Sequence, residues 1–164
     1  ISGGGGHDVI EGGFGDDTLL GGAGDDLLRA GFGANRLEGG AGEDQLYGSD
    51  DGADVLLGGD ANDRLWGYAG NDTLEGGTGD DILEGGGGCD RFVVRAGEGH
   101  DVIKDFSRSD KIDLSRAVDG ARFRDLDLQQ TDSGVVLTLA DGGTVTFEGL
   151  SLDDLDRDNM LLSA

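Results

Sequence analysis

The chain has 164 residues, of which 35 are glycine, none is proline and one is cysteine, and its formal net charge is −23 at pH 7. Its sign excludes nucleic acid as an expected partner, because phosphates would be repelled. Disulfides are not expected to stabilise the fold, and no apolar run reaches the roughly 18 residues that a membrane span requires. So acidic a chain would repel itself in a compact state unless a cation neutralises it.

The N-terminus reads Ile1-Ser2-Gly3 and lacks a methionine, a basic region and an apolar core. A secretory signal peptide would show the last two features. We therefore expect the chain to be a segment of a longer protein.

A nine-residue repeat begins at Gly3 and runs through ten consecutive units to Val93. Units such as GGFGDDTLL, GGAGDDLLR and GGTGDDILE share a glycine-rich start, an acidic sixth residue and a large apolar eighth residue. Only the sixth unit carries an extra residue, in the Asp50-Asp51 turn, and the register is unchanged after it.

Each unit predicts a turn over its first six residues and a short strand over its last three, because glycine supplies positive φ. The strand should bury its central apolar side chain and turn its two neighbours outward. Two units then make one coil, and alternate units stack as two ladders of parallel strands. The predicted core is the eighth residue of every unit: Ile10, Leu19, Leu28, Leu37, Leu46, Leu56, Leu65, Leu74, Leu83 and Phe92.

The repeat needs a further source of stability. One buried leucine contributes about 1.5–3 kcal/mol, whereas ordering the backbone costs about 1–2 kcal/mol for each residue. The sixth residue is acidic in nine of the ten units, and carboxylates stacked at about 4.8 Å would repel each other. A divalent cation between successive turns would reverse this repulsion.

Calcium suits these turns best, because it accepts six to eight oxygen ligands, including backbone carbonyls, whereas magnesium demands a tighter octahedron. Zinc would require clustered histidine or cysteine, and His7, His100 and Cys89 are scattered. The predicted carboxylate and amide ligands are Asp8, Asp26, Asp44, Asp63 and Asp81 in one stack, and Asp17, Asn35, Asp54, Asp72 and Asp90 in the other. Glycines expected to present the turn to the ion are Gly4, Gly6, Gly13, Gly15, Gly22, Gly24, Gly40, Gly42, Gly59, Gly77 and Gly79.

Five turns per stack leave four gaps, so the repeats could hold up to about eight ions. These would nearly cancel the net charge of −16 that residues 1–93 carry. The stack from Asp8 to Asp81 should fill better, because Ala30 with Asn35, the Asp50-Asp51 insertion and Tyr68 depart from the pattern in the other. One or two sites there are expected to be weak or empty. The alternative is that some of these aspartates are turn residues only.

The units resemble the repeats-in-toxin (RTX) nonapeptide G-G-x-G-x-D-x-U-x, where U is a large apolar residue. The resemblance implies an all-β fold: a right-handed parallel β-roll of two short sheets, followed by a C-terminal antiparallel β cap. We expect the roll to span residues 1–93 and the cap to span residues 94–164.

The segment GEGHDVIKDFSRSDKIDLS, residues 97–115, is similar to the sequence that follows the roll in RTX proteases, lipases and alginate epimerases. Asp101, which we include among the metal ligands, could hold a further ion with Asp105, Asp110 and Asp113, or these could be solvated loop charges. LDLQQT, GVVLTLA and TVTFEGL predict an antiparallel meander. Alternation at Val136, Thr138, Thr144 and Thr146 indicates one buried face. Such a cap would cover the open end of the solenoid.

The tail SLDDLDRDNMLLSA has Ser151 as a candidate helix N-cap, with Asp153 and Asp154 near the positive end of the helix dipole. Acidic residues before a short apolar terminus resemble the family's uncleaved signal for a type I secretion channel. A final strand that closes the cap is an alternative, and both could hold together.

No motif of an enzyme occurs in the chain: there is no GxSxG elbow, HExxH helix or P-loop. His7, His100 and Cys89 are expected at the surface, and the module is predicted to be non-catalytic. One outward surface could serve a partner, because Tyr47 and Trp66 should lie on adjacent rungs beside Arg29 and Arg64. This surface would suit an anionic polysaccharide, or the rings could simply pack across strands.

We therefore expect a calcium-binding RTX module of a secreted, extracellular protein. It would stay unfolded where calcium is scarce, pass the type I secretion machinery and fold on Ca²⁺ outside the cell, supporting an attached enzyme or toxin. The alternative is a polysaccharide- or cell-surface-binding module of a carbohydrate-active enzyme.

Overall fold

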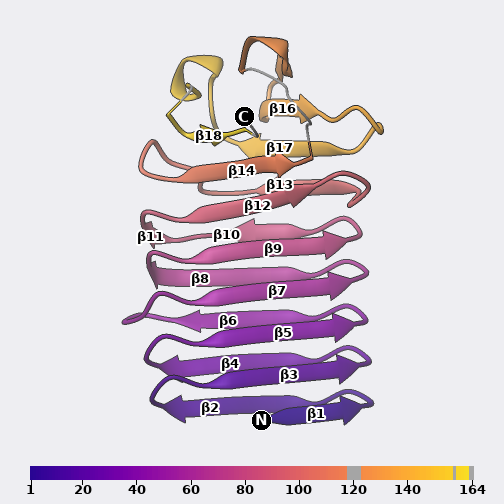
Figure 1. Ribbon diagram of the computed structural model, residues 1–164, viewed down its shortest axis with the longest axis vertical. Helices are drawn as coiled ribbons and strands as arrows, with labels where there is room; N and C mark the ends of the chain where they lie inside the picture. The colour runs from indigo at the N-terminus through magenta and orange to yellow at the C-terminus, as the bar shows by residue number, and fades with distance from the viewer. Residues whose placement is uncertain (118–122, 157, 163–164) are drawn as a thin grey trace.

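The computed structural model describes residues 1–117, 123–156 and 158–162. These residues form a solenoid of parallel strands with two sheets, and an antiparallel meander lies at its C-terminal end (Figure 1). The all-β parallel roll with an antiparallel cap, expected from the repeat, is confirmed. In the described ranges no helix is both long and apolar enough to traverse a membrane.

The two ladders alternate along the chain. The first sheet contains, in order, β1 (Ser2–Gly5), β3 (Thr18–Ala23), β5 (Arg36–Ala41), β7 (Val55–Asp60), β9 (Thr73–Thr78), β12 (Arg91–Arg95), β14 (Lys111–Arg116) and β18 (Met160–Leu161). The second sheet contains β2 (Val9–Phe14), β4 (Leu27–Phe32), β6 (Gln45–Ser49), β8 (Arg64–Gly70), β10 (Ile82–Glu84), β13 (His100–Ile103), β17 (Thr144–Glu148), β16 (Gly134–Thr138) and β15 (Asp127–Gln130). The short strand β11 (Gly87–Gly88) pairs with β8.

Each coil consists of two repeats, as the sequence predicts. Leu19 pairs with Leu37 and Leu37 with Leu56, so equivalent residues lie side by side across the sheet and the insertion is absorbed in its turn. All ten predicted core residues are at most 5% exposed, and nine of them are at most 1% exposed. The apolar eighth positions therefore form one continuous column between the sheets.

Most strands of the roll are longer than three residues, which corrects the predicted length. Several contain six residues, because the extended chain continues from the last three residues of one unit into the first three of the next, as in Val9–Phe14. Glycine permits this because its backbone pairs across coils without a side chain to accommodate. The true turn is only the fourth to sixth residues of each unit.

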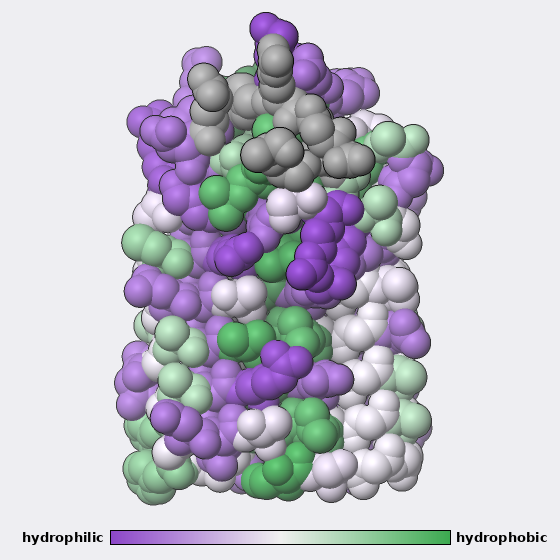
Figure 2. All heavy atoms as spheres, viewed as in Figure 1, coloured by the Kyte–Doolittle hydropathy of each residue, from purple (hydrophilic) through white to green (hydrophobic). Residues whose placement is uncertain are grey.

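Outward positions are mixed in chemistry. Figure 2 shows hydrophobic and hydrophilic residues interspersed along the face that this view presents. In the first sheet, Leu20 pairs with Glu38, and Glu38 pairs with Leu57. This alternation prevents a continuous apolar patch on the outer face of the first sheet.

The ladders continue beyond residue 93. β12 pairs in parallel with β14, and β10 pairs in parallel with β13. Phe106 packs between this region and the cap, with its ring 5.8 Å from that of Phe92 and 5.1 Å from that of Phe147. The meander therefore shares a core with the roll.

The cap is the predicted meander of β15, β16 and β17, and β17 joins the roll by pairing in parallel with β13. Its buried face carries Val135, Leu137, Val145 and Phe147, each 0% exposed. The helix expected after Ser151 is only a single 3-10 turn, Leu152–Asp154, in which the Asp154 carboxylate accepts hydrogen bonds from Ser151. The apolar tail forms β18 beside β14, and Ser163 and Ala164 lie outside the described residues.

Candidate metal-binding turns

A ladder of carboxylates links the coils on each side of the roll. From the second turn of each stack onward, the Oδ1 atom of the sixth-position side chain accepts a hydrogen bond from the backbone N–H of the equivalent residue one coil earlier. Asp44 Oδ1 accepts from Asp26 in this way at 2.7 Å, and Asp63 Oδ1 accepts from Asp44 at 2.7 Å. Eight such bonds, of 2.7–2.9 Å, run through the ten repeats. One carboxylate oxygen of each residue therefore fixes the register of neighbouring coils.

The other carboxylate oxygen has no partner in most units. Eight Oδ2 atoms are buried and accept no hydrogen bond from any described residue. These belong to Asp8, Asp17, Asp26, Asp44, Asp63, Asp72, Asp81 and Asp90. Burying a carboxylate oxygen without a hydrogen-bond donor costs folding free energy. Such an oxygen is a suitable ligand for a hard cation.

The first glycine of each unit frames these unpartnered oxygens. A Cβ at Gly58 would lie 2.3 Å from Asp63 Oδ2 and 2.4 Å from the carbonyl oxygen of Gly76. At Gly21 the corresponding distances are 2.5 Å to Asp26 Oδ2 and 2.6 Å to the Gly39 carbonyl oxygen. Sequence reasoning missed these first-position glycines as site residues, although their recurrence was the available signal.

The predicted turn glycines lie where backbone geometry requires glycine. All eleven, at the second or fourth position of their units, have φ between 99° and 135°. Two non-glycine residues occupy equivalent positions with positive φ, namely Ala61 at 81° and Tyr68 at 73°. This conformation costs an L-residue about 1–2 kcal/mol, so the backbone of Tyr68 is strained at its position in β8.

Burial opposes ionisation of the ladder. The pKa of Asp63 is raised to about 8, first by desolvation and then by the charges of Asp81 and Asp44. The same causes, desolvation first, raise the pKa of Asp72 to about 7 and that of Asp44 to about 6. In the absence of a cation, the turns therefore hold carboxylates that resist charging at neutral pH.

Two successive turns of the second stack depart from this arrangement. Asn35 replaces the carboxylate, and its Nδ2 atom donates to Gly33 O at 2.9 Å. The Oδ2 atom of Asp54 accepts a hydrogen bond from the backbone N–H of Ser49 at 2.6 Å, and the Ser49 hydroxyl lies 2.9 Å away. In the Asp54 turn, Ser49 therefore donates to the Oδ2 atom, which has no hydrogen-bond donor in the regular turns.

The four acidic residues expected as a further site do not gather at one point. Asp101 Oδ1 accepts from the N–H of Asp81 at 3.2 Å and extends one ladder, and Asp110 Oδ1 accepts from Asp90 at 2.9 Å and extends the other. Asp105 accepts from the N–H groups of Gly85 and Gly86.

Asp113 pairs instead with Arg91, so its pKa is lowered by hydrogen bonds from Arg91 and Ser115 that outweigh desolvation. Glu98, which sequence reasoning did not single out, is 8% exposed beside Arg95, and desolvation raises its pKa to about 6.

Within the described part of the chain, no three His, Cys, Asp or Glu side chains converge as a ready-made metal cluster. An ion between coils would therefore depend on carboxylates from the stacked turns and on backbone carbonyls. His7 Nδ1 instead accepts a hydrogen bond from the N–H of Asp25 at 2.9 Å, His100 Nδ1 lies 3.0 Å from Thr144 Oγ1, and Cys89 is an exposed free thiol. The donor set is one of hard oxygens, which matches calcium and not zinc.

Three aromatic residues of the second sheet form a stack at the surface, two of them half-buried and Tyr68 exposed. The rings of Tyr47 and Trp66 are 4.6 Å apart and nearly parallel at 4°, and Tyr68 lies 6.4 Å from Tyr47. The guanidinium of Arg29 is 5.8 Å from the Tyr47 ring centre. Arg64 is adjacent on β8 and makes no ion pair with any residue that the structure describes.

Comparison with known proteins finds a family model that matches the repeats. A family model described as the RTX calcium-binding nonapeptide repeat matches residues 1–28, 20–52, 49–83, 57–92 and 66–103. No curated protein matches the chain.

Several solved structures share the fold. The R3 subunit of the Azotobacter vinelandii mannuronan C5-epimerase AlgE6 is 31% identical over 84% of this chain and 78% of its own, with a TM-score of 0.55. The R2 subunit of the same enzyme is 32% identical over 74% of this chain and 89% of its own, also with a TM-score of 0.55. The extracellular lipase LipA from Serratia marcescens is 24% identical over 96% of this chain, with a TM-score of 0.53, and the match spans 38% of the lipase.

Proposed function

Because the chain belongs to the family of RTX calcium-binding nonapeptide repeats, we propose that it is a module whose coils are joined by calcium ions and that folds when calcium is available. The observation that carries the proposal is the series of eight buried Oδ2 atoms without a hydrogen-bond donor. These oxygens recur once per turn at the position where the family pattern places its aspartate.

The residues fit the ion. The sixth-position aspartates would supply one oxygen each, the glycine turns would supply carbonyl oxygens, and the first-position glycines leave space beside the carboxylate. Calcium would contribute positive charge to stacked carboxylates that otherwise repel each other and resist ionisation. With five unpartnered carboxylates in one stack and three in the other, the Asp8 to Asp81 stack is the stronger candidate for full occupancy.

Binding of this kind couples to folding. A ligand that binds only the folded state contributes about 4 kcal/mol per site at 1,000 times its dissociation constant, and several sites in series add up. A chain that is unfolded where calcium is scarce could pass a type I secretion channel, and it would fold in the extracellular medium. The module would then support an attached enzyme or toxin without performing catalysis itself.

Far-UV circular dichroism and calcium titration test this proposal on the full chain. We expect a largely unfolded spectrum in excess chelator, a β-rich spectrum in millimolar calcium, and more than one bound ion per chain by calorimetry. A spectrum of the folded roll in chelator, unchanged by calcium, would contradict the proposal. Magnesium at the same concentration is the matched control and should leave the chain unfolded.

Polysaccharide binding is a second candidate function, favoured by the half-buried stack of Tyr47 on Trp66, with the Arg29 guanidinium over the Tyr47 ring. Modules of a mannuronan C5-epimerase share the fold, and Arg64 on β8 adds a hydrogen-bond donor beside the stack. Trp66 is the only tryptophan, so its fluorescence on titration with alginate reports on this surface directly. No change with any polysaccharide would remove this candidate and leave calcium-dependent folding untouched.

A further inference from the structure

Three departures from the nonapeptide pattern meet at one place on the second sheet. Ser49 replaces the second glycine of its unit, the single inserted residue of the repeats lies in the Asp50-Asp51 turn, and Tyr68 occupies a glycine position with φ of 73°. Ser49 and Tyr68 are paired in register on β6 and β8. The same turn is the one where protein donors occupy Asp54 Oδ2. The turn that contains Ser49 and Asp54 therefore lacks the unpartnered Oδ2 atom that the regular turns share.

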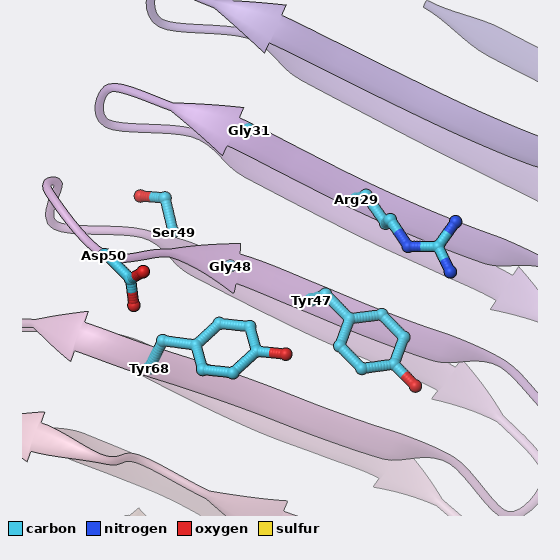
Figure 3. A pocket seen from close by; sticks show the side chains of 7 residues that line it. All are labelled: Arg29, Gly31, Tyr47, Gly48, Ser49, Asp50 and Tyr68. Carbon is cyan, nitrogen blue, oxygen red and sulfur yellow. The ribbon is translucent and has the colours of Figure 1, made fainter.

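An open groove of about 390 Å³ takes its place. Its walls include Arg29, Tyr47, Ser49, Asp50 and Tyr68. Figure 3 shows the two tyrosine rings on neighbouring strands, with Asp50 beside the base of Tyr68 and Arg29 on the far side of Tyr47. Tyr68 is 46% exposed, so its strained backbone places a large aromatic surface at the solvent boundary. Strain of this kind tends to persist where the side chain has a role.

The groove continues along the sheet. A second hollow, of about 220 Å³, is lined by Phe14, Phe32 and Glu11 and shares Arg29 and Gly31 with the first. Phe14 and Phe32 are stacked 4.9 Å apart and are 88% and 52% exposed. Exposed rings on β2, β4 and β8 and the half-buried Tyr47 ring on β6 therefore extend over four strands, a length suited to a chain of several units.

The charges of this strip argue against an anionic ligand. The Arg29 guanidinium lies 3.6 Å from the Glu11 carboxylate, which offsets its charge. Asp50 adds a carboxylate to the groove wall, and the whole chain carries −23. What remains is a set of flat apolar surfaces with one exposed carboxylate as acceptor and one guanidinium as donor, the combination that fits a ligand with apolar C–H faces and neutral hydroxyl groups.

We propose that the groove between Tyr47 and Tyr68 binds a neutral oligosaccharide whose sugar rings pack on the tyrosine rings. The inference rests on the second candidate function and specifies its ligand as an uncharged chain of hexoses. Sugar hydroxyls would donate to the Asp50 carboxylate and accept from Arg29. The Phe14 and Phe32 pair would hold a neighbouring part of the same chain.

Calorimetry and Trp66 fluorescence on the calcium-loaded full chain test the proposal with cellohexaose, mannohexaose, maltohexaose and an oligomannuronate. We expect at least one neutral hexasaccharide to bind and the oligomannuronate to bind more weakly. Tyr68→Gly should weaken binding by about tenfold, the loss of one stacked ring, and the fold should be retained because glycine suits that φ. Tyr47→Ser should have a similar effect.

Leu20→Ser, an exposed change on the first sheet, is the control and should bind as the parent chain does. Binding of the oligomannuronate alone would overturn the neutral-ligand proposal and leave the polysaccharide function standing. Absence of binding by all four probes, in a chain whose circular dichroism shows calcium-dependent folding, would overturn both and leave the calcium module intact. Neutral binding that Tyr68→Gly and Tyr47→Ser leave unchanged would place the site elsewhere and refute the assignment.

Discussion

Replacing Asp63 by asparagine separates the two roles of a sixth-position carboxylate: the hydrogen bond that its Oδ1 atom accepts and the ion binding proposed for its Oδ2 atom. The Oδ1 atom accepts a 2.7 Å hydrogen bond from the N–H of Asp44, and an asparagine oxygen can keep that bond. Asn35 shows this within the same molecule, because its Oδ1 accepts from Asp17 at 2.8 Å while its Nδ2 donates to Gly33 O. The substitution therefore removes only the ionisable oxygen.

The expected effects have opposite signs with and without calcium. Burial raises the pKa of Asp63 to about 8, so this carboxyl, which is ionised in the unfolded chain at about pH 7.5, must take up a proton when the calcium-free roll folds. That uptake costs on the order of a few kcal/mol, which Asp63→Asn should recover. With calcium in large excess, loss of one ion that the carboxylate holds should cost about 4 kcal/mol. Chemical denaturation followed by circular dichroism measures both free energies of unfolding, provided a stabilising osmolyte populates the folded state in chelator.

Asp80→Asn is the matched control. Asp80 occupies the exposed fifth position of its unit, and its Oδ1 accepts from the N–H of His100 at 3.0 Å. Asparagine already holds that position as Asn62 and Asn71, so the change should be nearly neutral in both conditions. If Asp63→Asn destabilised the chain equally with and without calcium, the carboxylate would be a hydrogen-bonding residue only, and the assignment of Oδ2 to an ion would fail.

Three further outcomes are expected. Burial raises the pKa values of Asp44, Asp63 and Asp72 to about 6–8, so the folded population of the calcium-free chain should increase as pH falls from about 8 toward 5. The apparent calcium affinity should fall over the same range, because protons compete with calcium for the carboxylates. Circular dichroism measures the first change and calorimetry the second. Gly58→Ala should destabilise the calcium-loaded roll by more than about 2 kcal/mol, since its Cβ would lie 2.3 Å from Asp63 Oδ2, whereas Gly5→Ala, with nothing within 4 Å, should be tolerated in the same thermal melts. The double change Asn35→Asp with Ser49→Gly restores the pattern and should raise the calorimetric ion count; an unchanged count would argue against a link between the unpartnered oxygen and binding.

Much of the fold follows from the sequence because the repeat is strict. The eighth-position residues, from Ile10 to Phe92, recur in phase with the strands, so one register places all of them in the core. The length of the strands did not follow, because glycine is normally a turn signal, whereas here Gly21 and Gly22, the first two residues of a unit, continue strand β3. The first-position glycines were missed as site residues for the same reason.

The end of the repeat is less distinct in space than in sequence. Gly97, Gly99, Asp101 and Ile103 occupy equivalent places to the second, fourth, sixth and eighth residues of a unit, with φ of 85° and 116° at the glycines. Residues inserted after Val93 break the spacing of nine, so periodicity alone ends there. Backbone pairing and the Asp81 to Asp101 hydrogen bond carry the ladder past that point. The change at residue 93 is therefore a change in sequence composition, and the parallel strand pairing continues beyond it.

The candidate site was predictable in kind but not in detail. Counting aspartates finds the stacked turns, yet it cannot show that Oδ1 and Oδ2 have different surroundings. That difference explains why Asn35 is compatible with the fold and why Ser49 matters, since one keeps the register bond and the other satisfies Asp54 Oδ2. Neither residue could be given its role without the hydrogen bonds.

The distribution of the unpartnered oxygens bears on cooperativity. In a solenoid each coil contacts only its neighbours, so stability propagates along the ladders. The stack from Asp8 to Asp81 has an unpartnered carboxylate in every turn, while the opposite stack is interrupted at Asn35 and Asp54. Because every coil belongs to both stacks, the uninterrupted one can carry ion-linked folding past the interruption. Under the proposed function, the roll would therefore carry the proposed groove in one stack and still fold as a single calcium-dependent unit.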